Sequence, residues 1–352
     1  MLPRITAEIA RNQGWISFAR YMELALHAPG GYYAGGARKF GAEGDFVTAP
    51  ELGRLFGRTL ARQLKALLEA DETRSILEIG AGSGALAQTL LEELSCNYFI
   101  LETSADLRAR QRERLGDRAT WLDSLPQRFR GVIVANEVVD AMPVHAVAWR
   151  AQGIMERGVA ADGERLLWKD RPASGVLLEE ARKIVPPVPY ESEIGLTGQA
   201  WLRSLAERLE KGAIFVIDYG FPRHEYYHPQ RAAGTLMCHH RHQAHGDVFA
   251  RPGGEDLTAH VDFSALAEAA RAAGLDVLGY ATQAQFLVNC GITDVLGEAN
   301  VENALHYAPL AAEANQLLSP AEMGELFKVL AVGRGVQKPL LGFTHNDRSH
   351  TL

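Results

Sequence analysis

Three glycines at alternate positions follow a short apolar stretch and carry the clearest chemical signal in the chain. Residues 75–86 predict a strand, a glycine-rich turn at Gly80, Gly82 and Gly84, and the first turn of a helix. Glycines there let backbone N–H groups approach a ligand, and the positive end of the helix favours a carboxylate or a phosphate. Glu78 would repel a phosphate but suits a ligand that also has a cationic centre. We therefore favour S-adenosylmethionine, which carries a sulfonium, an ammonium and a carboxylate.

The same glycines also fit a nicotinamide dinucleotide. Gly80, Gly82 and Ala85 satisfy the G-x-G-x-x-A pattern, so the glycines alone leave both cofactors open, and such a turn can also arise from packing alone. The next predicted strands, at 97–102 and 119–123, both end in an acid. We expect Glu102 to accept hydrogen bonds from ribose hydroxyls, a role that either cofactor requires. Asp123 is expected to approach the adenine amino group.

A fourth predicted strand, at 131–137, ends in a cluster of polar residues. Glu137 and Asp140 are three positions apart, so one turn of helix would place both carboxylates on one side. Beside a methyl donor they suit a cationic acceptor, and a guanidinium fits best because its planar fork pairs with carboxylates. We expect Glu137, Asp140 and Asn136 to be catalytic. The alternative is a helix N-terminus, where the two acids would only favour the helix dipole.

Further polar residues follow a later strand, predicted at 213–218. Asp218 lies at its end, and Asp256 and His260 come after a long loop; we expect these three to contact the substrate. Asp262 is most simply a helix N-cap. The loop holds Cys238 and several histidines, which could ligate a metal. Because no cysteine pair or H-E-x-x-H pattern accompanies them, we predict a polar lid loop and no metal site.

Composition narrows the classes of partner. The 352 residues are 47% hydrophobic with a formal net charge of −7, and no Lys/Arg-rich block indicates a nucleic-acid surface. Three separated cysteines suggest no disulfide framework and a reducing compartment. The N-terminal residues do not resemble a signal or transit peptide, and no apolar stretch is long enough for membrane insertion. We therefore expect a cytoplasmic protein.

The order of elements predicts an α/β fold. Residues 1–72 are expected to form a helical region that covers the cofactor, in which Thr48 opens a long helix with a capping box. The core spans 73–143 and 199–335, with a β-meander inserted at 144–198 and a flexible tail at 336–352. Seven core strands are expected, which is the number typical of the Rossmann-like class I methyltransferase fold.

Several longer strings resemble one known family. They are the G-Y-Y string at 31–33, the G-D-F-x-T-S-P-E signature at 44–51, the glycine turn at 78–84, the block at 136–144, D-Y-G at 218–220 and the segment at 256–263. This is the MidA-like family of S-adenosylmethionine-dependent methyltransferases, which includes the mitochondrial complex I assembly methyltransferase. The resemblance covers about Gly14 to Gly335. With these signatures we also expect cofactor contacts from Gly31, Tyr32, Thr48, Pro50 and Asn136.

The resemblance implies methylation of arginine in a protein. In the mitochondrial member this is symmetric dimethylation of a respiratory complex I subunit, and the eukaryotic relatives act in the mitochondrial matrix. The chain departs from the family at Ala49, where serine is usual, and at Val138 and Val139, where aromatic residues are common. Two alternatives stay open: an NAD(P)-dependent oxidoreductase, and a methyltransferase fold that assists assembly without turnover. The glycine turn lies more than seventy residues into the chain, and acidic residues follow the fourth strand; both features argue against the oxidoreductase.

Overall fold

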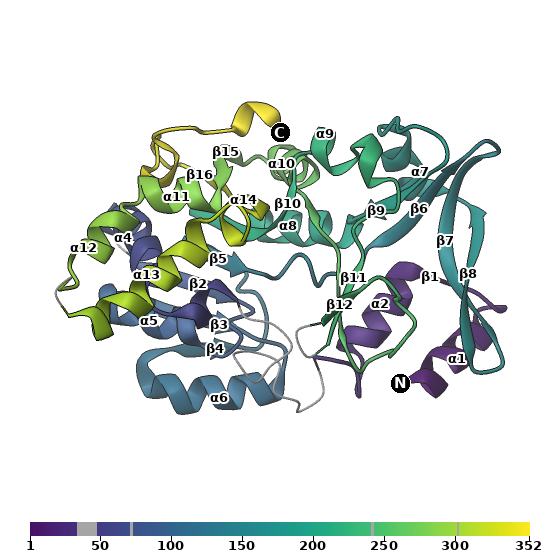
Figure 1. The fold of residues 1–352 in the computed structure, drawn as a ribbon, viewed down its shortest axis with the longest axis horizontal. Helices are drawn as coiled ribbons and strands as arrows, with labels where there is room; N and C mark the ends of the chain where they lie inside the picture. Colours follow the sequence, from purple (N-terminus) through teal and green to yellow (C-terminus); the bar gives the residue numbers. More distant parts are fainter. Residues whose placement is uncertain (34–47, 71–72, 241–242, 301–302) are drawn as a thin grey trace.

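A twisted sheet of mostly parallel strands forms the centre of the protein (Figure 1). The computed structural model describes residues 1–33, 48–70, 73–240, 243–300 and 303–352. The seven strands lie in the order β15 (Asp276–Thr282), β16 (Phe327–Arg334), β10 (Leu209–Phe221), β5 (Phe129–Asn136), β2 (Ser75–Ile79), β3 (Asn97–Leu101) and β4 (Thr120–Leu122). β16 runs antiparallel to both of its neighbours, and the short β14 (Val261–Asp262) adds to the end of β10. The expected class I methyltransferase fold is confirmed.

Helices cover both faces of this main sheet, which explains its continuous apolar strands. All five residues of β2 are buried, as are residues 213–217 of β10. One face packs against α4 (Leu55–Glu69), α5 (Ala85–Glu93), α11 (Gln283–Asn289), α12 (Ile292–Gly297) and α13 (Ala304–Leu318). The other packs against α8 (Leu196–Arg208) and α10 (Phe263–Ala272). Connecting helices are α6 (Ala105–Leu115), α9 (Arg223–Tyr226) and α14 (Met323–Leu326).

The helix expected to begin at Thr48 is instead interrupted. α3 (Ala49–Leu52) makes a single turn, Thr48 makes no side-chain capping bond, and α4 starts afresh after Gly53. The N-terminal N–H groups of α4 still need acceptors. Glu313 on α13 supplies one, because its Oε1 accepts from the Leu55 N–H at 2.7 Å. A residue far away in the sequence therefore caps this helix, and the local capping box does not.

A second sheet lies to the right of the main sheet in Figure 1. The three strands expected at 145–168 are formed as β6 (His145–Arg150), β7 (Gly153–Asp162) and β8 (Arg165–Pro172). Two strands that the sequence did not predict join them: β9 (Tyr190–Ile194) pairs with β6, and β1 (Ile16–Ser17) pairs with β7. This sheet packs against three helices, α1 (Leu2–Arg11), α2 (Phe18–His27) and α7 (Gly175–Arg182). Ser17 caps α2, accepting from the Arg20 N–H at 3.1 Å.

A small sheet of three short strands lies between the two larger ones in Figure 1. Its order is β12 (Gln243–His245), β11 (Met237–His240) and β13 (Asp256–Thr258), all antiparallel. It is formed by the segment in which we expected a polar lid loop. Residues 44–47 of the proposed family signature lie outside the described residues.

The C-terminal segment packs against the core, so the expectation of a flexible tail was wrong. Leu340 and Phe343 are buried, and the Phe343 ring lies 5.4 Å from that of Phe286. The Arg348 N–H donates to the Tyr280 carbonyl at 2.7 Å, which ties the segment to β15. Of the helices in the described ranges, none is both long and apolar enough to cross a membrane.

Candidate active site

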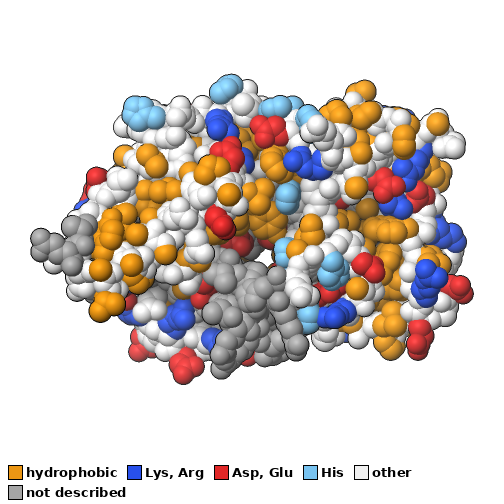
Figure 2. All heavy atoms as spheres, viewed as in Figure 1, with side chains coloured by type: hydrophobic (Ala, Val, Ile, Leu, Met, Phe, Trp, Pro, Cys, Tyr) orange, Lys and Arg blue, Asp and Glu red, His pale blue; other side chains and the backbone are white. Residues whose placement is uncertain are grey.

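A cavity of about 450 Å³ lies at the carboxyl ends of β2, β3, β5 and β10, facing the small sheet. Open α/β sheets bind ligands at this edge, and the volume falls within the range of roughly 300–1,000 Å³ common for ligand pockets. The surface is hollowed near the centre of Figure 2, between the elements of these two sheets. The polar residues of the lining include Glu78, Glu102, Asn136, Glu137, Asp140, Tyr219, Asp256 and His260.

The glycine turn adopts the backbone that its sequence requires. Gly80, Gly82 and Gly84 have φ values of +68°, +54° and +82°, a region that costs other residues roughly 1–2 kcal/mol each. Gly80 and Gly82 line the cavity. Gly84 does not; it is the N-cap of α5, and a Cβ there would lie 3.4 Å from Gln111. Two of the three predicted glycines therefore face the ligand space, and the third shapes the turn.

Glu78 is a buried carboxylate at the end of β2. Its Oε2 accepts from the Tyr98 hydroxyl at 2.7 Å. Burial raises the pKa of Glu78 to about 7, the nearby Glu102 carboxylate adds to the rise, and the Tyr98 hydrogen bond opposes it. A cationic group in the cavity would favour the ionised form of Glu78. This environment suits an ammonium better than a phosphate.

Glu102 lines the cavity as predicted, and a residue that the sequence did not single out positions it. Its Oε1 accepts from the Ser104 N–H at 2.9 Å, and its Oε2 accepts from Gln111 Nε2 at 3.2 Å. Gln111 also donates to the Gly82 carbonyl at 2.9 Å and accepts from Trp121 Nε1 at 2.9 Å. Gln111 thus links the glycine turn to Glu102. A lone glutamine on α6 gives no sequence signal for this role.

Asp123 does not reach the cavity, so the expected adenine contact is not supported. Its side chain is 90% exposed, and its carboxylate pairs with Arg108 Nη1 at 2.8 Å. β4 ends at Leu122, and Asp123 lies in the bend that follows it. The pattern of a strand followed by an acid was right, but the side chain points to solvent.

The G-Y-Y string contributes its last residue to the cavity. A Cβ on Gly31 would lie 2.8 Å from the carbonyl oxygens of Ala25 and Ala28, and the Tyr32 ring is buried in the N-terminal core. Neither lines the cavity, whereas Tyr33 does, and its hydroxyl donates to Asp256 Oδ1 at 3.0 Å.

Two predicted cofactor contacts that directly follow residues 34–47 in the sequence line the cavity. Thr48 and Pro50 form part of its wall at the start of α3. Glu51, the last residue of the signature at 44–51, lines the cavity too and accepts a hydrogen bond from the Ser83 hydroxyl. This contact ties α3 to the glycine turn.

The paired carboxylates lie on a turn and not on a helix. β5 ends at Asn136, and Glu137 adopts a left-handed backbone with φ +52°, which breaks the strand. No helix begins between Glu137 and Met142 in this described stretch, so the helix-dipole alternative for these acids does not apply. Asp218 holds the turn instead. Its Oδ2 accepts from the N–H groups of Val138, Val139 and Asp140 at 3.2, 2.9 and 3.2 Å.

Asp218 is therefore placed differently from our expectation. It is fully buried behind the turn and does not line the cavity, so it is a positioning residue and not a substrate contact. Its Oδ1 accepts from the Tyr219 N–H at 2.9 Å. Burial and the neighbouring Asp140 and Glu137 carboxylates raise the pKa of Asp218, while the backbone N–H bonds oppose this rise.

Glu137 and Asp140 face the same cavity in a poorly solvated setting. Burial raises the pKa of Glu137 to about 8, and repulsion from the Asp140 carboxylate adds to it; a hydrogen bond from Asn136 opposes the rise. Burial also raises the pKa of Asp140, against the hydrogen bond that Tyr219 donates to its Oδ2 at 2.5 Å. Asp140 Oδ1 has no hydrogen-bond partner among the described residues. The pair can bind a cation.

Asp256 and His260 line the cavity as expected. Asp256 is buried on β13 and accepts a hydrogen bond from the Tyr33 hydroxyl. His260 packs edge-on against Tyr219, with ring centroids 5.3 Å apart. Burial, followed by the positive charge of Arg231, lowers the pKa of His260 to about 4, so this ring is neutral near pH 7. His260 therefore offers a polar contact without a charge.

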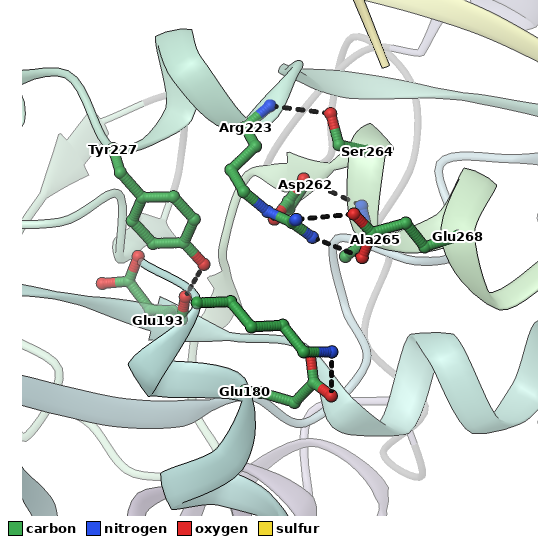
Figure 3. Close-up of polar contacts among 9 residues, drawn as sticks. Glu180, Glu193, Arg223, Tyr227, Asp262, Ser264, Ala265 and Glu268 are labelled. Carbon is green, nitrogen blue, oxygen red and sulfur yellow. Dashed lines mark hydrogen bonds and ion pairs between the residues drawn. The ribbon is translucent and has the colours of Figure 1, made fainter. Parts of the chain in front are cut away.

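Ion pairs around Asp262, two residues after His260 in the sequence, hold the adjoining segment in place (Figure 3). Arg223 donates to both carboxylate oxygens of Glu268, at 2.6 and 2.8 Å, and Asp262 lies beside its guanidinium. Asp262 caps α10, as predicted, by accepting from the Ala265 N–H at 3.0 Å. Tyr227 donates to the Glu193 carbonyl at 3.0 Å. A small cavity of about 30 Å³ lies among these residues, separate from the larger one.

Comparison with known proteins identifies the cofactor. A crystal structure of a protein from Burkholderia thailandensis bound to S-adenosyl-homocysteine is 51% identical, covers 100% of this chain and 96% of its own, and superposes with a TM-score of 0.96. The cofactor is S-adenosylmethionine, and the nicotinamide alternative is set aside. The cavity fits this group: Glu78 suits an ammonium, the glycine turn exposes backbone, and the side-chain oxygen of Asn136 is buried without a partner among the described residues.

Curated relatives share most of their length with this chain. The Danio rerio protein arginine methyltransferase NDUFAF7, mitochondrial, is 31% identical over 94% of this chain and 89% of its own. The Drosophila melanogaster NDUFAF7 homolog is 28% identical over 95% and 86%. Residues 55–281 match the family model described as "Putative S-adenosyl-L-methionine-dependent methyltransferase". With this match across most of the chain, the protein belongs to that family and is an S-adenosylmethionine-dependent methyltransferase.

Proposed function

We propose that the enzyme methylates the guanidinium of arginine in a protein substrate. The observation that carries this proposal is the pair of carboxylates, Glu137 and Asp140, on the wall of the cofactor cavity. The described part of the cavity lining includes no lysine or arginine that could neutralise them. A guanidinium presents a planar fork of N–H donors that matches two carboxylates, whereas an ammonium acts as a point charge.

Glu137 and Asp140 would act by holding and orienting this cation. Asp218 fixes the turn that carries both, and Tyr219 fixes the Asp140 carboxylate. When bound, S-adenosylmethionine supplies a methyl group on a sulfonium that leaves as a neutral thioether. Glu137 is suited to take the proton that the methylated nitrogen releases, because its pKa of about 8 makes it a stronger base than an exposed glutamate.

The relatives support the choice of acceptor. Those from Danio rerio and Drosophila melanogaster are named mitochondrial protein arginine methyltransferases. The sequence motifs resemble a family with a mitochondrial complex I assembly methyltransferase, so we extend the proposal to a respiratory complex I subunit as the target. For this chain, whose three separated cysteines favour a reducing compartment, we propose action in the cytoplasm.

The test is to incubate lysate with S-adenosylmethionine labelled in its methyl group and the purified enzyme. The labelled protein is then identified by mass spectrometry, and the modified residue is located. We expect the label on an arginine, and loss of the label when that arginine is changed to lysine. Label on lysine, on a carboxyl group or only on small molecules would overturn the arginine assignment. Cofactor binding without any transfer would favour an assembly factor.

Asp140→Asn separates catalysis from structure. The substitution keeps the shape and the contact with Tyr219 but removes the charge that pairs with the guanidinium. We expect near-normal binding of S-adenosyl-homocysteine by calorimetry and a fall in single-turnover transfer of roughly 10²–10⁴-fold, as for loss of an acid–base group. Wild-type turnover together with a lower melting temperature would show that Asp140 only supports the turn.

A further inference from the structure

The small sheet presents two faces with different chemistry. Met237, His239 and Ala244 line the methyl-transfer cavity. Because successive side chains of a strand point to opposite faces, Cys238 lies on the other face of β11. Cys238 is paired in register with His245 on β12 and with Leu257 on β13. Glu255 directly precedes β13 and lies two residues before Leu257, so it falls on the same face. β11, β12 and the residue before β13 thus bring a thiol, an imidazole and a carboxylate together.

These three side chains meet closely. One potential ligand atom from each lies within 4.8 Å of those of the other two. Cys238 and Glu255 are 1% and 4% exposed, and the His245 side chain is 36% exposed. His245 Nε2 lies 3.0 Å from Glu255 Oε2. None of the three lines the methyl-transfer cavity, so the cluster is distinct from the active site.

Hydrogen bonds within the described residues leave two polar atoms of this cluster without a partner. Glu255 Oε1 and His245 Nδ1 are buried and have no hydrogen-bond partner among the described residues. An unmet buried carboxylate oxygen costs free energy, because it has lost its hydrogen bonds with water. A bound cation would satisfy the carboxylate and convert the thiol into a thiolate.

We propose that Cys238, His245 and Glu255 bind a divalent cation of the zinc class. Thiolate, imidazole and carboxylate are the ligands that zinc and cobalt(II) accept together, whereas magnesium and calcium prefer oxygen alone. Binding forms one bond from each side chain to the cation and releases the thiol proton to solvent. Three protein ligands leave the fourth tetrahedral position to water. The cation would join β11, β12 and β13 and thereby stiffen the wall that carries Met237 and His239.

The test uses the full-length protein freed of metal by dialysis against a chelator, then titrated with cobalt(II) or zinc chloride. Cobalt(II) bound to thiolate gives a sulfur-to-metal charge-transfer band, and we expect this band at one equivalent. Zinc should displace it and raise the melting temperature, as any ligand of the folded state does. A band that never appears, together with a melting temperature unaffected by zinc, would overturn the proposal and leave only the His245–Glu255 ion pair.

Variants locate the site even if one of them folds poorly. Cys238→Ser should abolish the charge-transfer band, whereas Cys96→Ser, at a distant half-buried cysteine, should retain it. His245→Gln changes the most exposed of the three ligands. Changing a residue that only hydrogen-bonds to a metal ligand typically costs roughly 10–100-fold in metal affinity, and we expect a larger loss of zinc affinity here. The control is His224→Gln, because His224 also lies beside a glutamate, 3.7 Å from Glu225. Equal affinity in His245→Gln and His224→Gln would place the cation elsewhere and overturn the assignment.

Discussion

The two walls of the methyl-transfer cavity are assembled in different ways. The cofactor wall, defined by Glu78, Gly80, Gly82 and Glu102, comes from two neighbouring strands and the turn between β2 and α5. The acceptor wall, defined by Tyr33, Glu137, Asp140, Tyr219 and Asp256, comes from four separate segments of the chain. The cofactor wall is set largely by backbone geometry. The acceptor wall depends on hydrogen bonds between residues far apart in sequence.

This difference shows how the enzyme can hold a common cofactor and a particular acceptor. Backbone glycines and one carboxylate per strand end lie in a short motif, and we propose that they bind S-adenosylmethionine. The acceptor carboxylates are positioned by hydrogen bonds from other segments: Asp218 accepts from the 137–140 turn, and Tyr219 donates to Asp140. Substitutions on the first wall should therefore act on cofactor affinity, and those on the second on transfer.

The largest expected effect is on the cofactor wall, from Gly82→Val. The new side chain would enter the cavity that Gly82 lines and would also strain a φ of +54°. We expect no measurable binding of S-adenosyl-homocysteine by calorimetry and a stability loss of about 1–2 kcal/mol. Gly163→Val is the matched control, because Gly163 has a φ of +59° with open space around it and lies far from the cavity. Normal binding by the Gly82 variant would remove this turn from the site.

On the acceptor wall, Glu137→Gln should depress transfer by roughly 10²–10⁴-fold while cofactor affinity stays the same. In the wild type, kcat/KM should rise with pH up to about 8, since Glu137 must be ionised to accept a proton. The variant should lack this rise. A wild-type pH profile in the variant would assign the proton transfer to another group.

The same variant reports on the cost of the buried charge. The pKa of Glu137 is higher in the folded protein than its value of about 4.3 in an unfolded chain. Its contribution to stability is therefore fully present below about pH 4.3 and is lost as the pH rises to about 8. Glu137→Gln avoids this loss, so its melting temperature relative to wild type should increase from acid to alkaline pH. A constant difference across that range would show that Glu137 is well solvated.

A smaller effect is expected from Glu102→Gln on the cofactor wall. Loss of a charged acceptor should weaken S-adenosyl-homocysteine binding by roughly 1.5–3 kcal/mol. Asp123→Asn is the control, since Asp123 is 90% exposed and should leave affinity unchanged. If instead Asp123→Asn weakens binding and Glu102→Gln does not, the ribose contact belongs to Asp123.

The smallest of the four effects should come from Asp218→Asn, which tests the support behind the acceptor wall. An amide oxygen still accepts from the turn, but it lacks the charge, so we expect a stability loss of about 1.5 kcal/mol. Transfer should fall while S-adenosyl-homocysteine affinity is kept, because the turn carries Glu137 and Asp140. Unfolding by denaturant and single-turnover transfer measure the two effects. Equal loss of cofactor affinity would show that Asp218 supports both walls.

Sequence reasoning succeeded where structure is local. The glycine turn, the strand ends at Glu102 and Asn136 and the cap at Asp262 follow from short patterns whose cause lies within a few residues. It also brought Glu137 and Asp140 to one cavity, although through the wrong local geometry.

Prediction from the sequence failed where a residue distant in the sequence determines the local structure. Nothing near Thr48 reveals that Glu313 caps α4, and nothing near Asp218 reveals that it faces the 137–140 turn. Asp123 follows a strand as Glu102 does, yet tertiary packing turns one carboxylate outward and the other inward. Helices α11 to α14 were not assigned at all, and they cover one face of the sheet.

The position of β16 also bears on synthesis of the chain. Among the strands in the described residues, the one at 327–334 is translated last, yet it lies between β10 and β15, which are both translated earlier. Of the strands that the structure describes, only β16 pairs with β15, so β15 lacks this partner until β16 has left the ribosome. The hydrogen bonds of β16 with both strands would then form together, late and over long sequence separations, which slows folding. A polypeptide terminated before residue 327 would leave β10 with an unpaired hydrophobic edge, a hazard for aggregation that chaperones would have to contain.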